Sequence, residues 1–182
     1  MTPHALGGCL FDTAIGACGI AWTADVLAAV QLPEATREGT LARMRRRFPD
    51  LPQAPPPVFV AAAIERIQRS LNGTRDDLCD LQLDLAQVPE FHRRVYDIAR
   101  AIPPGEVLTY GEVAKRLGEP GASRAVGQAL GNNPFAPVVP CHRVLAAGRR
   151  SGGFSAEGGA TTKLRMLEIE KARFGDQPGL FD

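Results

Sequence analysis

A cysteine and a histidine stand side by side in the run Pro140-Cys141-His142-Arg143, directly after an apolar stretch. The thiolate is the reactive form of cysteine, and a free pKa of about 8.5 leaves little of it at neutral pH. A neighbouring histidine base and a cationic arginine are surroundings that raise the thiolate fraction. The pair therefore indicates a nucleophile. Cysteine is also one of the commonest small residues of protein cores, so the dipeptide alone is weak evidence.

The chain is long enough to build a sizeable core. Its 182 residues fit one domain or two small ones, and 45% of them are apolar. The four cysteines (Cys9, Cys18, Cys79 and Cys141) are scattered without a C-x-x-C pair, and no secretory signal precedes Ala5. These features predict a reduced, cytosolic protein. No apolar stretch approaches the roughly 20 residues of a membrane span, so no membrane role is expected.

The net charge is only +1, but the charges are unevenly distributed. Residues 1–88 carry eight Lys and Arg against ten Asp and Glu, a balance of −2, whereas residues 89–182 carry thirteen against ten, a balance of +3. Within residues 110–152 the count is six against two. A locally basic segment fits a polyanionic partner, although many solvated faces have the same composition.

The first half mixes strand and helix patterns. Short apolar runs broken by turns predict a β-meander over residues 8–32. Residues 34–48 and 58–71 have helical composition and are separated by a proline-rich connection, while alternating leucines predict a strand over 80–87. Strand-type pattern gives way to helix-type pattern at residues 88–89, where we expect a domain boundary.

An arginine run marks the end of the 34–48 helix and consists of Arg43, Arg45, Arg46 and Arg47. Cations are favourable at the C-terminal end of a helix, and the simplest interpretation of the run is a solvated face. A direct role in DNA binding is the less favoured alternative.

The second half is predicted to be helical. Apolar residues at helical spacing predict a helix over 91–102, which Pro103-Pro104-Gly105 ends. Thr109-Tyr110-Gly111-Glu112 has the form of a capping box and opens a short helix. After a glycine-containing turn, residues 122–131 form the next helix. Two short helices joined by such a turn predict a helix-turn-helix, whose second helix usually contacts DNA.

The 122–131 helix consists of small residues apart from Arg124 and a few others. Small residues can simply allow tight packing between helices. Against that alternative, Gly127 in the helix interior costs about 1 kcal/mol relative to alanine, which suggests that something approaches its backbone closely.

Several motifs of the second half follow one another in an order that is typical of one family. They are Ile102-Pro-Pro-Gly-Glu-Val-Leu-Thr-Tyr110-Gly-Glu-Val-Ala, Ser123-Arg124-Ala-Val-Gly127, Gly131-Asn-Asn133-Pro and Val139-Pro-Cys141-His142-Arg143-Val144. Over residues 89–170 the chain closely resembles the O6-alkylguanine-DNA alkyltransferases, also called methylated-DNA–protein-cysteine methyltransferases. The first half matches this family only loosely, through Thr13-Ala-Ile-Gly16 and the leucines of the 80–87 segment.

The resemblance implies two domains and a tail. Residues 1–88 are expected to form a ribonuclease-H-like α/β domain. Residues 89–174 are expected to form a mainly α, winged-helix-like domain that contains the helix-turn-helix, and residues 175–182 form a tail. The implied reaction is direct-reversal DNA repair, in which Cys141 takes the alkyl group from O6-alkylguanine irreversibly and once per molecule. No cofactor is expected, because the alkyl group arrives on the double-stranded DNA. A bacterial, cytoplasmic monomer is expected.

The resemblance also implies how Cys141 is activated. His142 is expected to deprotonate the thiol through a bridging water, and a glutamate is expected to orient His142. Spacing alone leaves Glu168 and Glu170 open. The family places its glutamate seven residues after the lysine that opens the last helix, here Lys163, and this register favours Glu170.

The remaining roles also follow from the resemblance. Tyr110 is expected to donate a hydrogen bond to the leaving guanine, and Asn133 to tie the recognition helix to the cysteine loop. The target base must be flipped out of the duplex, and Arg124 is expected to fill the vacated stack while Ala122 and Gly127 let the helix enter the minor groove. Further expected positions near DNA or the active-site loop are His92, Arg143 and Ala147. The alkyl pocket is expected to include Pro137, Val144, Phe154 and Ser155.

The loop after the cysteine departs from the family pattern. Residues 151–159 stand where many relatives have a tyrosine followed by a small residue and glycine, and the loop is about two residues longer. Phe154 lacks the hydroxyl of that tyrosine. The size of alkyl group that fits therefore stays open, as does the preference between O6-alkylguanine and O4-alkylthymine.

Three other functions fit parts of the sequence. A non-catalytic relative that only flags alkylated bases has tryptophan in place of the cysteine, which Cys141 argues against. A helix-turn-helix regulator needs no Cys-His-Glu set, and a cysteine hydrolase needs an oxyanion-hole motif that is not evident. The spacing of His4, Cys9, Cys18 and His92 matches no zinc signature, so no metal is expected.

The tail contains a possible docking peptide. Gln177-Pro178-Gly179-Leu180-Phe181-Asp182 resembles the Q-x-x-L-F peptides that bind bacterial sliding clamps. Terminal residues are usually disordered unless something ties them down. The Leu180-Phe181 pair therefore either folds back on the protein or binds a partner, with Gln177 as a polar contact.

Overall fold

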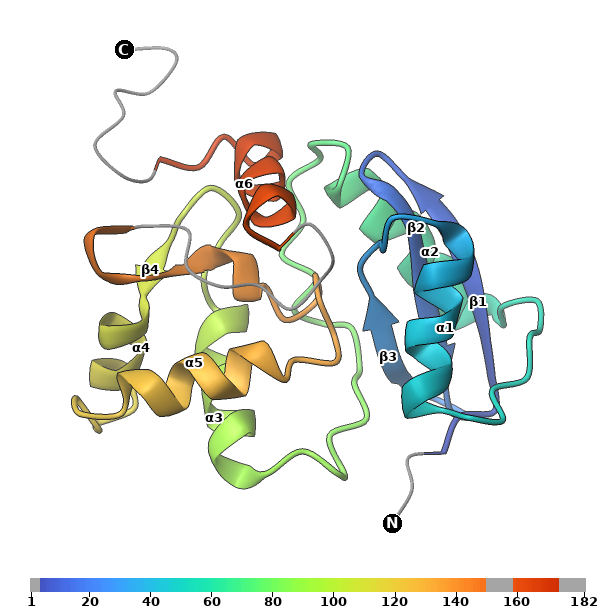
Figure 1. The fold of residues 1–182 in the computed structure, drawn as a ribbon, viewed down its shortest axis with the longest axis horizontal. Coiled ribbons are helices and arrows are strands. Elements are labelled where there is room, and N and C mark those ends of the chain that lie inside the picture. Colours follow the sequence, from blue (N-terminus) through green and yellow to red (C-terminus); the bar gives the residue numbers. More distant parts are fainter. Residues whose placement is uncertain (1–3, 150–158, 174–182) are drawn as a thin grey trace.

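A three-stranded antiparallel sheet begins the chain in the computed structural model, which describes residues 4–149 and 159–173 (Figure 1). Strands β1 (Gly7–Thr13), β2 (Gly16–Trp22) and β3 (Leu27–Gln31) pair in chain order. The turn between β1 and β2 closes at Gly16, whose φ of 126° lies where glycine is favoured. The β-meander predicted for residues 8–32 is confirmed.

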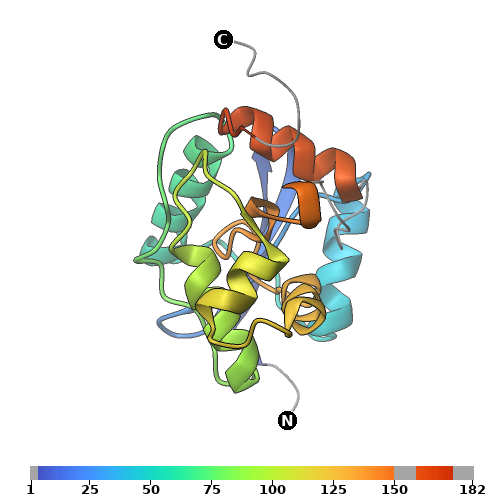
Figure 2. The same cartoon turned by 90° about the vertical axis from the view of Figure 1, so that its left-hand side faces the viewer.

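Two helices cover opposite faces of this sheet, as Figure 2 shows. Helix α1 (Arg37–Arg47) lies on the face of Gly19, where an added Cβ would stand 2.0 Å from Met44 Sδ, so the glycine permits the close approach of the helix. Helix α2 (Val58–Ser70) packs on the other face, in one cluster with Ile20. Successive strand residues point to opposite faces, so alternate residues of β2 pack against α1 and against α2. Both predicted helices are confirmed.

The strand predicted over residues 80–87 is wrong. Within this fully described run, Leu83 alone bridges to the sheet, through one parallel bridge to Leu27. The Asp84 carboxylate accepts a hydrogen bond from the backbone of Ala86 at 3.1 Å, which bends the chain away from the sheet. Aspartate side chains that bond the backbone two residues on compete with sheet pairing, and the leucine alternation does not reveal this competition.

The second half is mainly helical, as predicted. Its elements are α3 (Glu90–Arg100), β4 (Leu108–Thr109), α4 (Tyr110–Arg116), α5 (Ser123–Gly131), β5 (Val144–Leu145) and α6 (Gly159–Ile169). The predicted capping box is present: Thr109 Oγ1 accepts from Glu112 N at 3.1 Å, and the Glu112 carboxylate accepts from Thr109 N at 2.7 Å. Helices α4 and α5 pack against each other and against α3, and β4 pairs with β5 in parallel.

The two halves share one hydrophobic core. Ile20 and Val60 of the first half belong to the same cluster of buried residues as Val95 and Val138 of the second. The expected division at residue 88 stays a prediction, although α3 does begin at Glu90. In the described part of the chain, no helix has the length and apolar character needed to cross a membrane.

Candidate active site

Cys141 opens a short 3-10 turn, η1 (Cys141–Arg143), at the end of a buried loop that follows α5. The backbone carbonyl of Pro134 in this loop accepts a hydrogen bond from Val30 N of β3 at 2.9 Å. The loop is thereby held between α5 and the sheet of the first half. Cys141 itself is only 6% exposed, so the loop presents its cysteine from within the core.

Asn133 connects the end of α5 to the cysteine loop. Its side-chain Nδ2 donates to the Val139 carbonyl at 2.8 Å, and its Oδ1 accepts from Phe135 N at 2.9 Å. Its side chain also makes a hydrogen bond that lowers the pKa of Cys141. The structure thus places Asn133 where the sequence predicts it, between the helix and the reactive turn.

His142 lies against a carboxylate inside the protein. It is 1% exposed, and its Nε2 stands 2.7 Å from Glu170 Oε1. Nδ1 is buried and has no hydrogen-bond partner among the described residues. When Nε2 carries the proton and donates it to Glu170, Nδ1 keeps its lone pair and can accept a proton. The alternative glutamate, Glu168, is exposed.

Arg143 binds the same carboxylate. Its Nη2 lies 2.7 Å from Glu170 Oε1 and its Nε 3.1 Å from Oε2, while Nη1 donates to the Ile102 carbonyl at 2.8 Å. Burial raises the pKa of Glu170, but His142 and Arg143 together outweigh it and lower this pKa to about 2. Burial lowers the pKa of His142 despite the adjacent carboxylate. At neutral pH His142 is therefore a neutral imidazole, and it lies beside the ion pair of Glu170 and Arg143.

The resting thiol is protonated, which corrects the expectation that its neighbours raise the thiolate fraction. Burial raises the pKa of Cys141 and outweighs Asn133 and Lys163, which lower it. Arg143 does not help, because its guanidinium faces Glu170. A base must therefore remove the thiol proton during a reaction, and the free Nδ1 of His142 is suited to that role.

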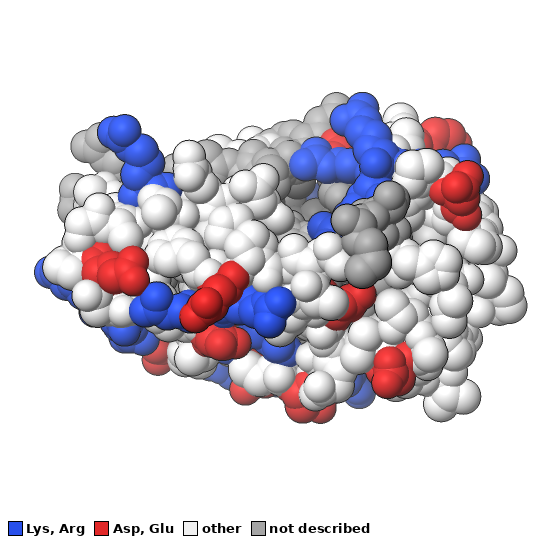
Figure 3. All heavy atoms as spheres, turned by 90° about the horizontal axis from the view of Figure 1, so that it is seen from below, with Lys and Arg blue, Asp and Glu red and all other residues white. Residues whose placement is uncertain are grey.

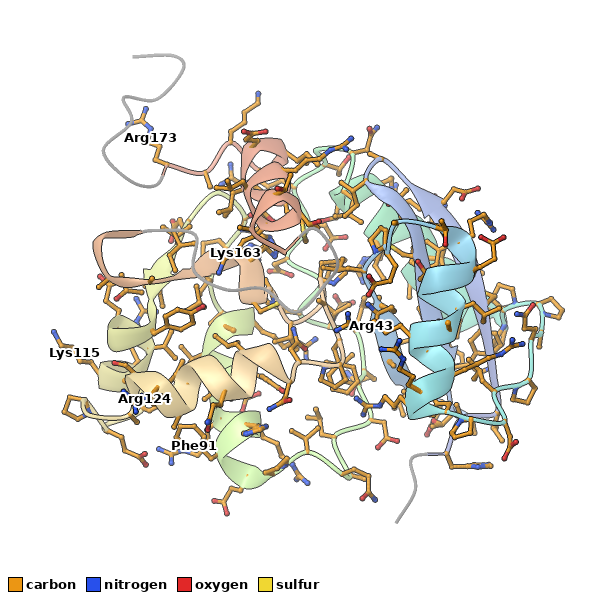
Figure 4. All side chains as sticks on the ribbon, in the orientation of Figure 1. Arg43, Phe91, Lys115, Arg124, Lys163 and Arg173 are labelled. Carbon is orange, nitrogen blue, oxygen red and sulfur yellow. The ribbon has the colours of Figure 1, made fainter. Side chains whose placement is uncertain are left out.

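Lys163 is a buried cation that sequence reasoning used only to set the register of α6. It is 1% exposed, its Nζ donates to the Val144 carbonyl at 2.7 Å, and it lies 5.8 Å from the centre of the Tyr110 ring (Figure 4). Burial lowers its pKa to about 8, although Cys141 acts to raise it. Its spacing to the buried Met166 and Leu167 is the signal that indicates its inward position.

Tyr110 is the first residue of α4, directly after the capping Thr109. It is half-buried, and burial raises the pKa of its hydroxyl. The phenol is therefore a proton-bearing donor at neutral pH. The capping box fixes the start of α4 and thus the position from which this side chain extends.

Helix α5 presents an open face beside these residues. Arg124 is exposed near its N-terminal end, and Ala122 at the N-cap is half-buried (Figure 4). Apart from its own helix backbone and chain neighbours, a Cβ added at Gly127 would meet no atom of the described residues within 4 Å, and the same holds at Gly131. Tight packing within the protein therefore does not explain these glycines.

Several predicted residues lie apart from the cysteine or outside the described residues. His92 packs against the rings of Phe91 and Tyr96 on α3, with centroids 6.4 Å and 6.2 Å away. Ala147 is exposed after β5. Of the expected alkyl pocket, Pro137 and Val144 are buried, and Phe154 and Ser155 lie outside the described residues.

The sequence predicts Arg143 near Cys141 and the active-site loop, and in the structure it is 3% exposed and binds Glu170. No group of three or more histidine, cysteine, aspartate or glutamate residues within 4–149 and 159–173 is arranged to hold a metal ion.

Comparison with protein families gives one matching model. The model of the 6-O-methylguanine DNA methyltransferase DNA-binding domain matches residues 90–172. The methylated-DNA–protein-cysteine methyltransferase of Mycobacterium tuberculosis is 35% identical over 171 residues, which cover 94% of this chain and 96% of that protein. The protein of the same name from Methanothermobacter thermautotrophicus is 34% identical over 152 residues, covering 84% and 78%.

Solved structures with the same fold are also found. The crystal structure of Mycobacterium tuberculosis OGT in complex with DNA superposes with a TM-score of 0.74 at 32% identity, covering 97% of this chain and all of that one. The O6-methylguanine-DNA methyltransferase of Pyrococcus kodakaraensis superposes with a TM-score of 0.72 at 27% identity, covering 90% and 98%. The likeness therefore extends over both halves of the chain.

Proposed function

The chain belongs to the O6-methylguanine DNA methyltransferase family, and on this premise we propose that Cys141 is the residue that takes up the alkyl group. The reaction is direct-reversal DNA repair, in which an alkyl group passes from O6 of guanine in DNA to a cysteine of the protein. The observation that supports Cys141 is the buried His142–Glu170 pair that begins at the next residue, with His142 Nδ1 left unpartnered among the described residues.

The first step is removal of the thiol proton. Glu170 holds the Nε2 proton of His142, so Nδ1 accepts the proton of Cys141 through a bridging water. Lys163 and the Asn133 side chain stabilise the thiolate that forms, because both lower the pKa of Cys141. The imidazolium is stabilised in turn by Glu170.

The second step is in-line displacement at the alkyl carbon. A bond forms between the sulfur of Cys141 and this carbon while the bond from carbon to O6 breaks, and its electron pair stays on the guanine. The hydroxyl of Tyr110 donates a hydrogen bond to the developing negative charge. The product is a thioether, which nothing in the site hydrolyses, so each molecule reacts once and no cofactor takes part.

The DNA complex follows from the open face of α5. The base is flipped out of the duplex at a cost of a few kcal/mol, and Arg124 fills the space that it leaves. Ala122 and Gly127 let α5 enter the minor groove, and the space beside Gly127 is not filled by any other described part of the chain. The packing of α4 on α5 supports a helix-turn-helix, and the β4–β5 pair supports the winged-helix-like description. The sheet covered by α1 and α2 supports the ribonuclease-H-like description of residues 1–88.

Stoichiometry tests this function. The full chain is mixed with an excess of duplex carrying one O6-methylguanine, and intact and peptide masses are measured. One methyl group per molecule is expected, on the peptide that contains Cys141. Cys79 is the internal control, because it is exposed and would be methylated by any non-specific reaction. Several turnovers per molecule, or methyl on Cys9, Cys18 or Cys79, would overturn the assignment.

The tail provides a further partner. We also propose that Gln177, Leu180 and Phe181, which lie outside the described residues, bind a bacterial sliding clamp. Tethering to a clamp would raise the effective concentration of the protein on newly replicated DNA. Titration of a clamp is expected to give binding for the full chain and none for a chain that ends at Asp176. Equal affinity for the two chains, or none for either, contradicts the proposal. A monomeric state and a cytoplasmic location stay predictions.

A further inference from the structure

A surface hollow of about 520 Å³ lies where α1 approaches the end of α5. One side is lined by the arginine patch, which we define as Arg43, Arg46 and Arg47 of α1. The other side is the segment Gly131–Pro134, and part of β3 (Ala29–Gln31) completes the lining. The hollow therefore joins the first half of the chain to the C-terminal end of the helix that is proposed to enter the minor groove.

The chain offsets only part of the positive charge of this patch, and the charge of Asp84 acts on Arg47. Among the described residues, no acidic side chain lines the hollow. Arg43 forms an ion pair with Glu34 at 2.7 Å, but Arg46 is exposed and makes no hydrogen bond or ion pair with any described residue. The buried Nε of Arg47 has no hydrogen-bond acceptor within the described chain, although its guanidinium lies 5.5 Å from the centre of the Phe48 ring. The buried Nε cannot itself reach an external acceptor, so the exposed Arg46 is the member of the patch whose charge is most available to one.

The position of the patch suits a phosphate backbone. Helix α5 has nine residues, which makes it about 13 Å long, roughly twice the width of about 6 Å of the minor groove. Its two ends therefore reach the strands that border the groove. Arg124 lies towards one end, and Arg43 on α1 lies beyond the other (Figure 4). In the view from below, basic side chains gather over two separate parts of the upper edge (Figure 3).

From this arrangement we propose that the arginine patch of α1 binds the phosphates of the DNA strand that passes the C-terminal end of α5. The first half of the chain then takes part in DNA binding, and the interpretation of the arginine run as a merely solvated face is replaced. The inference rests on the proposed function, because that function places α5 in the minor groove. Phosphate contacts add affinity without sequence preference, which suits a protein that must find a lesion in any sequence.

The closest matched control is the adjacent Arg45. It is exposed on the same helix turn, but it does not line the hollow. Arg45→Glu and Arg46→Glu change the net charge equally, so they separate position from charge. Arg47→Met removes the guanidinium of the half-buried member of the patch while keeping an unbranched side chain.

The experiment measures the affinity of the full chain for an undamaged duplex at several salt concentrations. Each phosphate contact contributes about −0.9 to the slope of log K against log salt. Arg46→Glu is expected to weaken binding roughly three- to tenfold and to reduce the steepness of the slope by about 0.9, and Arg47→Met to act in the same direction. Arg45→Glu is expected to leave the slope unchanged. Equal effects of the Arg45 and Arg46 variants, or an unaltered slope for Arg46→Glu, would overturn the proposal.

A second measurement separates this inference from the proposed function. Transfer from O6-alkylguanine supplied as the free base involves no phosphate. The wild-type chain, Arg45→Glu and Arg46→Glu are expected to react with it at equal rates. A slower reaction of Arg46→Glu alone would mean that the substitution disturbs the site itself, which contradicts a phosphate role. If the wild-type chain transferred nothing, the proposed function would fail, while the binding data would still decide the role of the patch.

Discussion

Replacing Cys141 with alanine is expected to abolish alkyl transfer completely while lesion-containing DNA still binds. The sulfur is the only atom proposed to form a bond with the alkyl carbon, whereas the proposed DNA contacts lie on α5 and α1. Removing one small buried side chain leaves both helices in place, at a modest cost in stability. The measurements are peptide masses after incubation with O6-methylguanine duplex and the affinity for the same duplex.

The complementary variant is Arg124→Ala, which is expected to weaken DNA binding while the thiol stays intact. This exposed residue of α5 makes no contact that holds the cysteine loop, so the thiol stays reactive towards the free base. Binding to duplex and transfer from duplex are expected to weaken, because nothing replaces the extruded base in the stack. Residual methylation in Cys141→Ala would disprove the assignment of the nucleophile. Repair of duplex by Arg124→Ala at the wild-type rate would disprove the base-flipping role.

Replacing Glu170 with glutamine is expected to slow transfer by about 10²- to 10⁴-fold, the usual contribution of general acid–base catalysis. The neutral amide no longer stabilises the imidazolium that forms when His142 takes the thiol proton. It also leaves Arg143, which is 3% exposed, without a counterion. Breaking a buried ion pair costs about 3 kcal/mol or more, so a lower melting temperature is expected as well. Single-turnover rates and thermal unfolding measure the two effects.

The matched control for this change is Glu168→Gln, which alters the same charge two residues earlier at an exposed position. It is expected to leave rate and stability unchanged. Comparable losses in the two variants would show that Glu170 has no special relation to His142.

The pH dependence gives Glu170→Gln a second readout. The pKa of Glu170 is lowered to about 2 from its ordinary value of 4.5. A depressed acid stabilises the fold above its unfolded pKa, so this contribution is complete above about pH 4.5 and is lost as pH falls towards 2. Wild-type stability is therefore expected to fall across this window, and that of Glu170→Gln to fall less. Because the pKa of His142 is lowered from 6.5, its neutral form persists below that pH, and the wild-type transfer rate is expected to hold there.

Local signals predicted the elements that hold the site. The capping box at Thr109 and Glu112 is decided by residues three apart, so it could be predicted from the sequence and is present in the structure. The C-terminal end of α5 could be predicted in the same way, because the glycine and asparagines that end the helix are neighbours in the sequence. The strand over residues 80–87 failed because pairing depends on a partner strand and on aspartate side chains that bend the chain.

The electrostatics of the site could not be predicted from the sequence. Neighbours in sequence suggested that Arg143 activates Cys141, but its guanidinium turns towards Glu170, 27 residues further along the chain. Burial then decides the protonation of the thiol, and burial is a property of the folded core. The sequence alone did not distinguish Glu168 from Glu170 as the partner of His142. Only the spacing from Lys163 in the family that the chain resembles favoured Glu170. Its catalytic role, like that of the other site residues, stays a prediction.

Both edges of the three-stranded sheet are closed by single bridges from elsewhere in the chain. Gln53 bridges to Gly8 on the β1 edge, and Leu83 and Phe135 bridge to Leu27 and Val30 on the β3 edge. Open sheet edges invite pairing between molecules, so these short contacts protect against aggregation. The segment that carries the nucleophile thus also shields the outermost strand of the other half. A fragment that ended at residue 88 would keep the Leu83 bridge but lose that of Phe135, so the Val30 part of β3 would be open to pairing between molecules.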